Sequence, residues 1–227
     1  MSIIKSMLQP STLTYIKKLQ KNNNKPWFEE NRLLFNEAKD DFEKLVKDII
    51  TSFGKVDADI APLEAKKCVF RQYRDVRFSK DKMPYKPHMG ASFDKGGKKS
   101  GFAGYYLHLE PGNKSMAGGG IWMPEAVQLK KIRQEIDYSW DEFSGIINQN
   151  DFKKIYGDLE QGDFKLSREP KGYEKDNPGI EYLKLKSLVA MQTLTDDDLV
   201  SKGLLQKIVS AFTALMPLIK FINRSLE

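Results

Sequence analysis

The sequence predicts a single α+β domain over residues 1–227, with a mainly antiparallel sheet packed against N- and C-terminal helices, and three observations predict it. Segments between about residues 67 and 122 alternate apolar and polar side chains as strands do, and a further strand is expected near residues 185–193. Both ends of the chain instead repeat apolar residues at helical spacing. Finally, 40% apolar residues in 227 are enough for a substantial core, and no repeat or linker-like segment divides the chain.

The N-terminal part is predicted to contain two helices. Ser11 or Thr12 is a suitable cap for a helix that runs through about Lys21, and the asparagines at 22–24 should end it. The second helix is expected to begin at Pro26 and to continue without a break through residue 53, since its apolar positions keep helical spacing until Gly54. Such a helix would be roughly 40 Å long and would lie across the sheet.

The middle of the chain is predicted to form the sheet. Residues 68–78 alternate well enough for a strand, and residues 79–87, with two prolines, form a loop after it. Further strands are expected at 89–93 and 105–110, and the second of these pairs with a returning strand at 114–122. The returning strand contains three consecutive glycines, residues 118–120, which indicates a bulge or a close approach by another backbone.

The remaining chain is predicted to be mostly helical. The spacing predicts helices over 124–139, 140–148 and 151–156 and a helical turn over 178–184, followed by the strand near 185–193. Thr195, with three aspartates after it, should cap a last helix that runs through Ile222. Pro217 lies inside that helix and is a position where it would be interrupted.

Positive charge is concentrated in one segment. Residues 66–99 contain eleven Lys or Arg and three Asp, whereas the whole chain carries a net charge of only +6. Clustered cations attract anions, and the planar guanidinium group of arginine matches phosphate or carboxylate. The sequence therefore predicts an anion-binding site made by Arg71, Arg74, Arg77, Lys80, Lys82 and Lys86.

Other side chains are candidates for the lining of a pocket near that cluster. Two tyrosines are interleaved with the basic residues, and His108 shares a strand face with Glu110, so that a proton-transferring pair is conceivable there. The candidates are Tyr73, Asp75, Tyr85, His108, Trp122 and Lys171. Two histidines and one cysteine show no ligand spacing, so no metal site and no cofactor are expected.

Three functions agree with these features. The first is binding of a phosphate-bearing or other anionic partner, either nucleic acid or a nucleotide, through the cluster at 71–86. The second is an enzyme acting on a small anionic or phosphorylated substrate, with Asp75, His108 or Tyr85 moving a proton. The third is a structural or protein-interaction role in which the cluster is paired internally. Whether the protein is an enzyme, and in what oligomeric state it exists, stays open at this point.

The sequence also suggests a compartment. No run approaches ~18 apolar residues, and the first twenty residues lack the apolar core and cleavage site of a signal peptide. The single cysteine, Cys68, cannot form a disulfide within the chain. A cytoplasmic protein without a membrane partner is therefore expected.

Several motifs resemble one known family. They are Asn22-Asn-Asn-Lys-Pro-Trp-Phe28, Phe70-Arg-Gln-Tyr-Arg-Asp-Val-Arg-Phe-Ser-Lys-Asp-Lys82 with Pro84-Tyr-Lys86, Tyr105-Tyr-Leu-His-Leu-Glu-Pro-Gly112, Gly118-Gly-Gly-Ile-Trp-Met-Pro124, Pro170-Lys-Gly-Tyr173 and Leu183-Lys-Leu-Lys-Ser187. Over residues 8–224 the chain resembles a bacterial family of uncharacterised proteins, domain of unknown function 2461. The resemblance implies an architecture and no chemistry. Members often have a His-Pro pair where this chain has Asn177-Pro178, so no mechanism needing a histidine there is expected.

Overall fold

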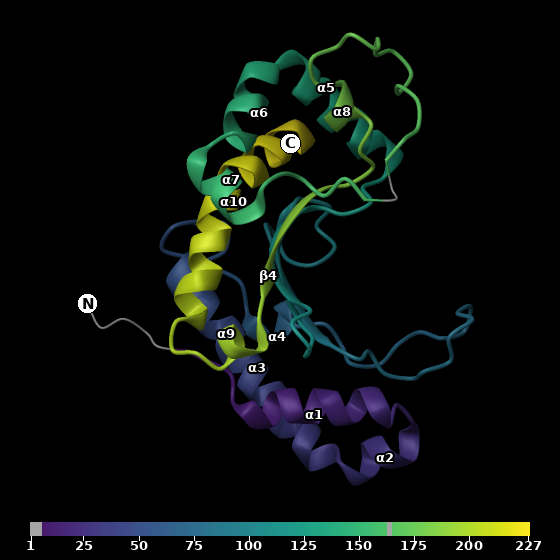
Figure 1. Cartoon of the computed structure of the whole chain (residues 1–227), viewed down its shortest axis with the longest axis vertical. Coiled ribbons are helices and arrows are strands. Elements are labelled where there is room, and N and C mark those ends of the chain that lie inside the picture. Colours follow the sequence, from purple (N-terminus) through teal and green to yellow (C-terminus); the bar gives the residue numbers. More distant parts are fainter. Residues whose placement is uncertain (1–5, 163–164) are drawn as a thin grey trace.

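The computed structural model describes residues 6–162 and 165–227, and a four-stranded antiparallel sheet lies at its centre. The strands follow one another across the sheet in sequence order: β1 (Met89–Asp94), β2 (Gly104–Leu109), β3 (Ser115–Ile121) and β4 (Leu188–Leu194). Adjacent hairpins join the first three, whereas β4 returns to β3 after a helical excursion. The predicted α+β fold, with helices at both ends, is confirmed (Figure 1).

One face of the sheet carries the core. Tyr105, Leu107 and Leu109 of β2 point to this face and are all buried. The ring of Tyr105 lies 4.8 Å from that of Phe53, at the end of α3 (Arg32–Phe53), and 5.0 Å from that of Phe212, in α10 (Leu204–Leu226). The two long helices therefore cover the same face of the sheet, and neither of them covers the opposite face.

The last helix, α10, is long and apolar enough to cross a membrane by length and composition alone, and half of its most apolar window is buried inside the molecule. Its side chains pack on β3, α3 and α5, which is how a core helix is used. Pro217 lies inside α10 without ending it.

The N-terminal helices differ from the prediction at one point. The structure has α1 (Pro10–Lys21), then α2 (Lys25–Glu30), and only then α3, so the helix expected over 26–53 is divided at Asn31. The Asn31 side chain donates to the carbonyl of Trp27 at 2.9 Å and closes the end of α2. Asn24 caps its start by accepting from the Trp27 backbone N–H at 3.0 Å.

The excursion between β3 and β4 forms one end of the molecule in Figure 1. It consists of α5 (Ala126–Tyr138), α6 (Trp140–Ile147), α7 (Asn150–Tyr156) and the short α8 (Ile180–Leu183). After β4, Thr195 caps as predicted, but it caps only the short α9 (Asp196–Leu199), and α10 begins separately at Leu204.

The strand predicted over residues 68–78 is wrong. Residues 65–68 form the single helical turn α4 (Ala65–Cys68), and residues 69–88 are irregular. One isolated bridge joins Val69 to Ala91 of β1, and another joins Tyr73 to Tyr85 within the segment. Both alternating sets of side chains carry charges, so neither face is apolar enough to be buried against a neighbour. Phe78 is 95% exposed. We call residues 71–86 the basic arm, and Figure 1 shows this segment projecting beside the sheet.

The three glycines of β3 allow close packing and form no bulge. Pairing with β4 is continuous from Ser115 to Ile121. A Cβ atom at Gly118 would collide with the carbonyl of Ala190, and one at Gly120 with the carbonyl of Leu188. The expectation of a close backbone approach is confirmed.

Candidate functional site

The second face of the sheet lines a cavity of about 940 Å³. Because side chains alternate along a strand, this face carries Ser92 of β1, Tyr106 of β2, Met116 of β3 and Met191 of β4, which form the floor. The walls come from segments outside the sheet, including Phe70, Phe102, Trp122 and Gln128. A cavity of this volume, with several aromatic groups, suits a small organic ligand.

Two of the predicted anion-binding arginines are paired within the basic arm. The Arg74 guanidinium lies 2.6 Å from the Asp81 carboxylate, and that of Arg77 lies 2.7 Å from Asp75. The hydrogen bond from Arg77 holds the pKa of Asp75 below its usual value. The pKa of Asp81 is also below its usual value, because its carboxylate accepts hydrogen bonds from the backbone N–H of Met83 and then from Arg74. These two arginines already have counter-ions.

The other cations of the arm are placed differently. Lys80 is exposed, and Lys82 is exposed and donates to the carbonyl of Val76 at 3.0 Å. Arg71 is exposed at the base of the arm, and Lys86 is half-buried at its end. Arg71 and Lys86 thus lie at the two ends of the arm, and the backbone N–H of Lys86 donates to the Gln72 carbonyl at 2.9 Å.

Lys86 has a cationic neighbour that sequence reasoning did not include. The ammonium groups of Lys86 and Lys98 lie 5.1 and 4.8 Å from the centroid of the same ring, Phe70. Burial, and then the charges of Arg71 and Lys98, lower the pKa of Lys86. Burial also lowers the pKa of Lys98, although Asp94 partly opposes it. Within residues 6–162 and 165–227, no carboxylate forms an ion pair with any of these three cations.

The predicted pocket residues divide into those near the cavity and those away from it. Trp122 lines the cavity, and His108 lies on the same face of the sheet beside Tyr106. Tyr85 is buried and Asp75 pairs with Arg77, so neither is available to move a substrate proton. Tyr73 packs on Phe28 and Tyr85, and Lys171 is exposed in the segment before α8.

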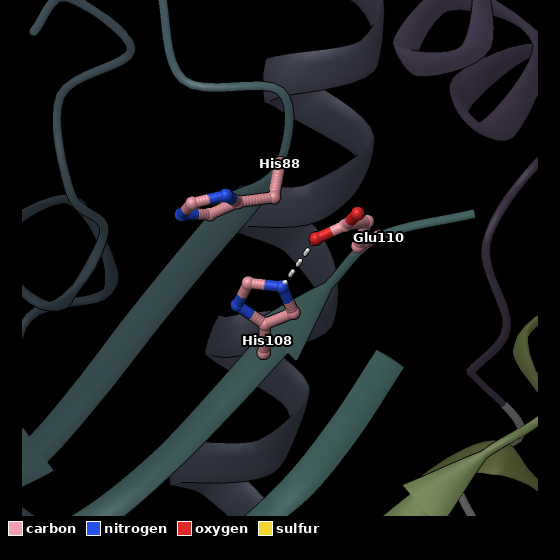
Figure 2. Close-up of side chains that lie close together, drawn as sticks. All are labelled: His88, His108 and Glu110. Atoms are coloured by element: carbon pink, nitrogen blue, oxygen red, sulfur yellow. Dashed lines mark hydrogen bonds and ion pairs between the residues drawn. The ribbon is translucent and has the colours of Figure 1, made fainter. Parts of the chain in front are cut away.

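A group of three titratable side chains lies at the end of the same face. His108 Nε2 is 3.1 Å from the Glu110 carboxylate, and His108 Nδ1 is 3.2 Å from the Tyr106 hydroxyl. The ring of His88 lies 4.3 Å from that of His108, centroid to centroid, so that the three side chains His88, His108 and Glu110 form one cluster (Figure 2). Burial, then His108, lowers the pKa of His88 to about 4.

The comparison with protein families decides which group this chain belongs to. Residues 11–221 match a family described as conserved hypothetical protein (DUF2461). The chain belongs to this family. No curated protein and no solved structure matches it. The description of DUF2461 names no reaction, so the chemistry of this member has to be argued from its own site.

Two of the DUF2461-like motifs fix the end of the basic arm. The Asn23 side chain donates to the Tyr85 carbonyl at 2.9 Å and accepts from the Tyr85 N–H at 3.0 Å. The buried Gln72 amide donates to the carbonyls of Lys86 and, at 3.2 Å, of His88. These bonds hold Lys86 and His88 beside the sheet, so the motifs serve to position the candidate site.

Sequence reasoning missed three residues of this DUF2461 site, namely Phe70, Lys98 and His88. His108 and Glu110 were visible as neighbours on one strand face. The position of His88 depends on the pairing of Met89 with Leu109, which sets His88 opposite Glu110. A hairpin register that joins residues twenty positions apart leaves no spacing signal in the sequence.

Proposed function

We propose that this DUF2461 protein binds a small phosphate-bearing ligand, such as a nucleotide, in the cavity over the open face of the sheet. The main support is that the ammonium groups of Lys86 and Lys98 both lie over the ring of Phe70. Among the described residues, neither ammonium group forms an ion pair with a carboxylate. Asp94 acts on Lys98 and Asp75 on Arg71, but neither carboxylate forms an ion pair with these cations. Clustered cations repel one another, and a bound anion reduces that cost.

The charge of the cluster supports a multiply charged anion. Arg71, Lys86 and Lys98 together offer three positive charges, and a phosphate group carries up to two negative charges with several acceptor oxygens. A carboxylate would neutralise only one of the three cations. A phosphate-bearing ligand is therefore the better match.

The cavity supports a small ligand in preference to a polymer. Phe70 lies on the cavity wall and also carries the two ammonium groups, so a ligand can place its phosphate at the cations and its body in the cavity. Tyr106 and Trp122, on the same cavity, offer aromatic surfaces for a base or another flat group. A nucleic-acid surface would use exposed cations along the arm. Arg74 and Arg77 there are already paired, which leaves only Arg71, Lys80 and Lys82 for it.

An enzyme acting on the same ligand class is the second candidate. Tyr106, His108 and Glu110 form a hydrogen-bonded chain on the cavity face of β2, with separations of 3.2 and 3.1 Å. Such a chain can accept or donate a proton at the His108 ring. This candidate shares the binding site and adds a reaction to it.

A thermal-shift titration tests the binding proposal. Inorganic phosphate, nucleoside mono- and triphosphates, sugar phosphates and short single-stranded DNA would be compared at low salt, since a ligand of the native state raises its apparent stability. We expect stabilisation by at least one small phosphorylated compound. The Lys86→Met/Lys98→Met variant, which keeps the apolar stems, should lose the effect.

The matched control is Lys80→Met/Lys82→Met, which removes two exposed lysines of the same arm. Each pair includes one lysine that donates to a backbone carbonyl, Lys98 to Val69 and Lys82 to Val76. The control should keep the full ligand response. Equal loss in both variants, or stabilisation by DNA alone that fades with salt, would contradict the proposal.

A further inference from the structure

The cluster of His88, His108 and Glu110 has the composition of a metal site. We propose that these three side chains bind one divalent transition-metal ion, with zinc as the reference ion. The inference goes beyond the proposed ligand binding and stands whether or not that binding occurs. It also departs from the expectation of no metal, which rested on spacing along the chain.

The geometry is close to that of a bound site. One ligand atom from each of the three residues can be chosen so that all lie within 4.8 Å of one another. His108 Nε2 and Glu110 Oε2 are already 3.1 Å apart. Ligand atoms around a tetrahedral zinc ion, with bonds of about 2.0–2.1 Å, are separated by roughly 3.3 Å. The His88 side chain would have to turn to bring its ligand atom closer to the other two, and Figure 2 shows its ring near that of His108, with Glu110 to one side.

The backbone holds the three ligands together without a metal. His108 lies in β2 and Glu110 directly follows it, so both project from the same face of the sheet. The carbonyl of His88 accepts from Gln72 at 3.2 Å, and that of the preceding Pro87 accepts from Gln20 at 3.0 Å. The ligands therefore come from anchored segments, and little ordering is needed when an ion binds.

The donor set selects a class of ion. Two imidazoles and one carboxylate are borderline ligands that suit zinc and its first-row neighbours better than magnesium or calcium, which prefer oxygen alone. Three protein ligands leave at least one coordination position for water or another ligand. All three residues are half-buried, so the cluster is not sealed inside the core.

A fourth residue has the role of a positioning partner. The Tyr106 hydroxyl lies 3.2 Å from His108 Nδ1. When the Nδ1–H donates to this hydroxyl, the contact fixes the orientation of the ring and leaves the Nε2 lone pair for the ion. Lys114 opposes the site weakly, since its ammonium group lies 3.7 Å from Glu110 Oε1 on an exposed side chain. A bound cation would displace that contact at little cost.

The small number of histidines in the chain makes a metal–imidazole bond easy to assign. It has only two histidines and one cysteine, so in an untagged protein any metal–imidazole bond must come from His88 or His108. We would titrate the metal-free full chain with Zn²⁺ by calorimetry and record the visible absorption of the Co²⁺ complex. The variants are His88→Gln, His108→Gln and Glu110→Gln, with folding checked by circular dichroism.

Two control variants complete the design. Glu37→Gln removes an exposed carboxylate on α3, and Cys68→Ser removes the thiol. We expect one ion per chain, unchanged affinity in both controls, and affinity weaker by at least about tenfold in each ligand variant. Tyr106→Phe should weaken binding by about 10–100-fold, as loss of an outer hydrogen-bond partner does.

Two results would overturn the proposal. One is the absence of Zn²⁺ and Co²⁺ binding to the wild-type chain. The other is binding of the same stoichiometry and affinity in the folded His108→Gln and His88→Gln variants, since the ion would then lie elsewhere. Because no phosphorylated ligand takes part in the titration, a failure here is distinct from a failure of the proposed function.

Discussion

The ring of Phe28 stacks on the ring of Tyr85, with centroids 4.0 Å apart and planes inclined by 10°. Phe28 belongs to α2, and Tyr85 lies at the end of the basic arm, 57 positions further along the chain. Both are buried. This contact joins the N-terminal helices to the residues that precede Lys86 and His88, and so connects the fold to both proposed sites.

Replacing Tyr85 by alanine tests the contact. Removing a fully buried aromatic ring should lower the free energy of unfolding by about 3–5 kcal/mol. Tyr85→Phe keeps the ring and should cost less than about 1 kcal/mol. Urea denaturation of the two variants measures both values. Similar losses in both would mean that the hydroxyl, and not the stacked ring, makes the contribution.

Asn23 is expected to hold the arm by its side-chain amide. Asn23→Ala removes two hydrogen bonds to the backbone of Tyr85 and should cost about 1–3 kcal/mol, because the Tyr85 N–H and C=O are left without their partner. Hydrogen exchange of the backbone amides of Tyr85, Lys86 and His88 should become faster. Asn22→Ala, which removes only a local bond to the Lys18 carbonyl, is the control and should leave those amides protected.

The sequence predicts much of this fold because its patterns are local. Alternation predicts the strand at 105–110, the turn after it predicts the returning strand at 114–122, and Thr195 with the aspartates after it predicts a helix cap. The prediction of a strand over 68–78 is wrong because alternation alone does not show whether one face of the segment can pack against an apolar surface. The break at Asn31 could not be predicted, because the apolar residues keep helical spacing across it. What ends α2 is a hydrogen bond from the Asn31 side chain to the Trp27 carbonyl.

The candidate site was only partly predictable for a different reason. Lys86 was identified from the concentration of charge, but the unpaired state of Lys86 and the pairing of Arg74 and Arg77 depend on which carboxylates fold next to them. Lys98 reaches Phe70 from the turn after β1. Contacts of this kind are set by tertiary structure, and charge counting cannot separate a paired cation from an unpaired one.

Asp57 should make the protein sensitive to acid. Its carboxylate is buried and accepts from Tyr105 Oη at 2.8 Å and from Lys220 Nζ at 2.6 Å. Burial alone would raise the pKa of Asp57, but hydrogen bonds, first from Lys220 and then from Tyr105, outweigh it and place the pKa below its usual value. The stability that this ionised group contributes is present above about pH 4 and is lost as pH falls through the folded-state pKa.

Asp57→Asn measures that contribution. The variant should be less stable than the wild type by about 1–3 kcal/mol near neutral pH, and the difference should shrink in acid. Urea unfolding of both proteins over a pH series gives the comparison. A difference that stays constant down to about pH 3 would show that the ionisation of Asp57 is not the cause.

Gly120 should not tolerate a side chain. A Cβ atom there would collide with the Leu188 carbonyl of β4, and the φ of +130° is unfavourable for other residues. Gly120→Ala should lower the free energy of unfolding by about 1–3 kcal/mol. Gly145→Ala is the matched control, because nothing lies within 4 Å of the new methyl group in α6, and it should raise stability by up to about 1 kcal/mol. Thermal unfolding of the two variants separates these outcomes by sign.

Backbone amide chemical-shift mapping by NMR shows where the proposed phosphorylated ligand binds. The wild-type protein would be titrated with the phosphorylated compound that stabilises it most. We expect the largest perturbations at residues 70–71, 86 and 98 and along the cavity floor at 106 and 119–121, with the paired part of the arm at 74–82 little affected. Perturbations centred on residues 74–82, with the cavity floor unchanged, would mean that the ligand binds to the paired part of the arm and not in the cavity.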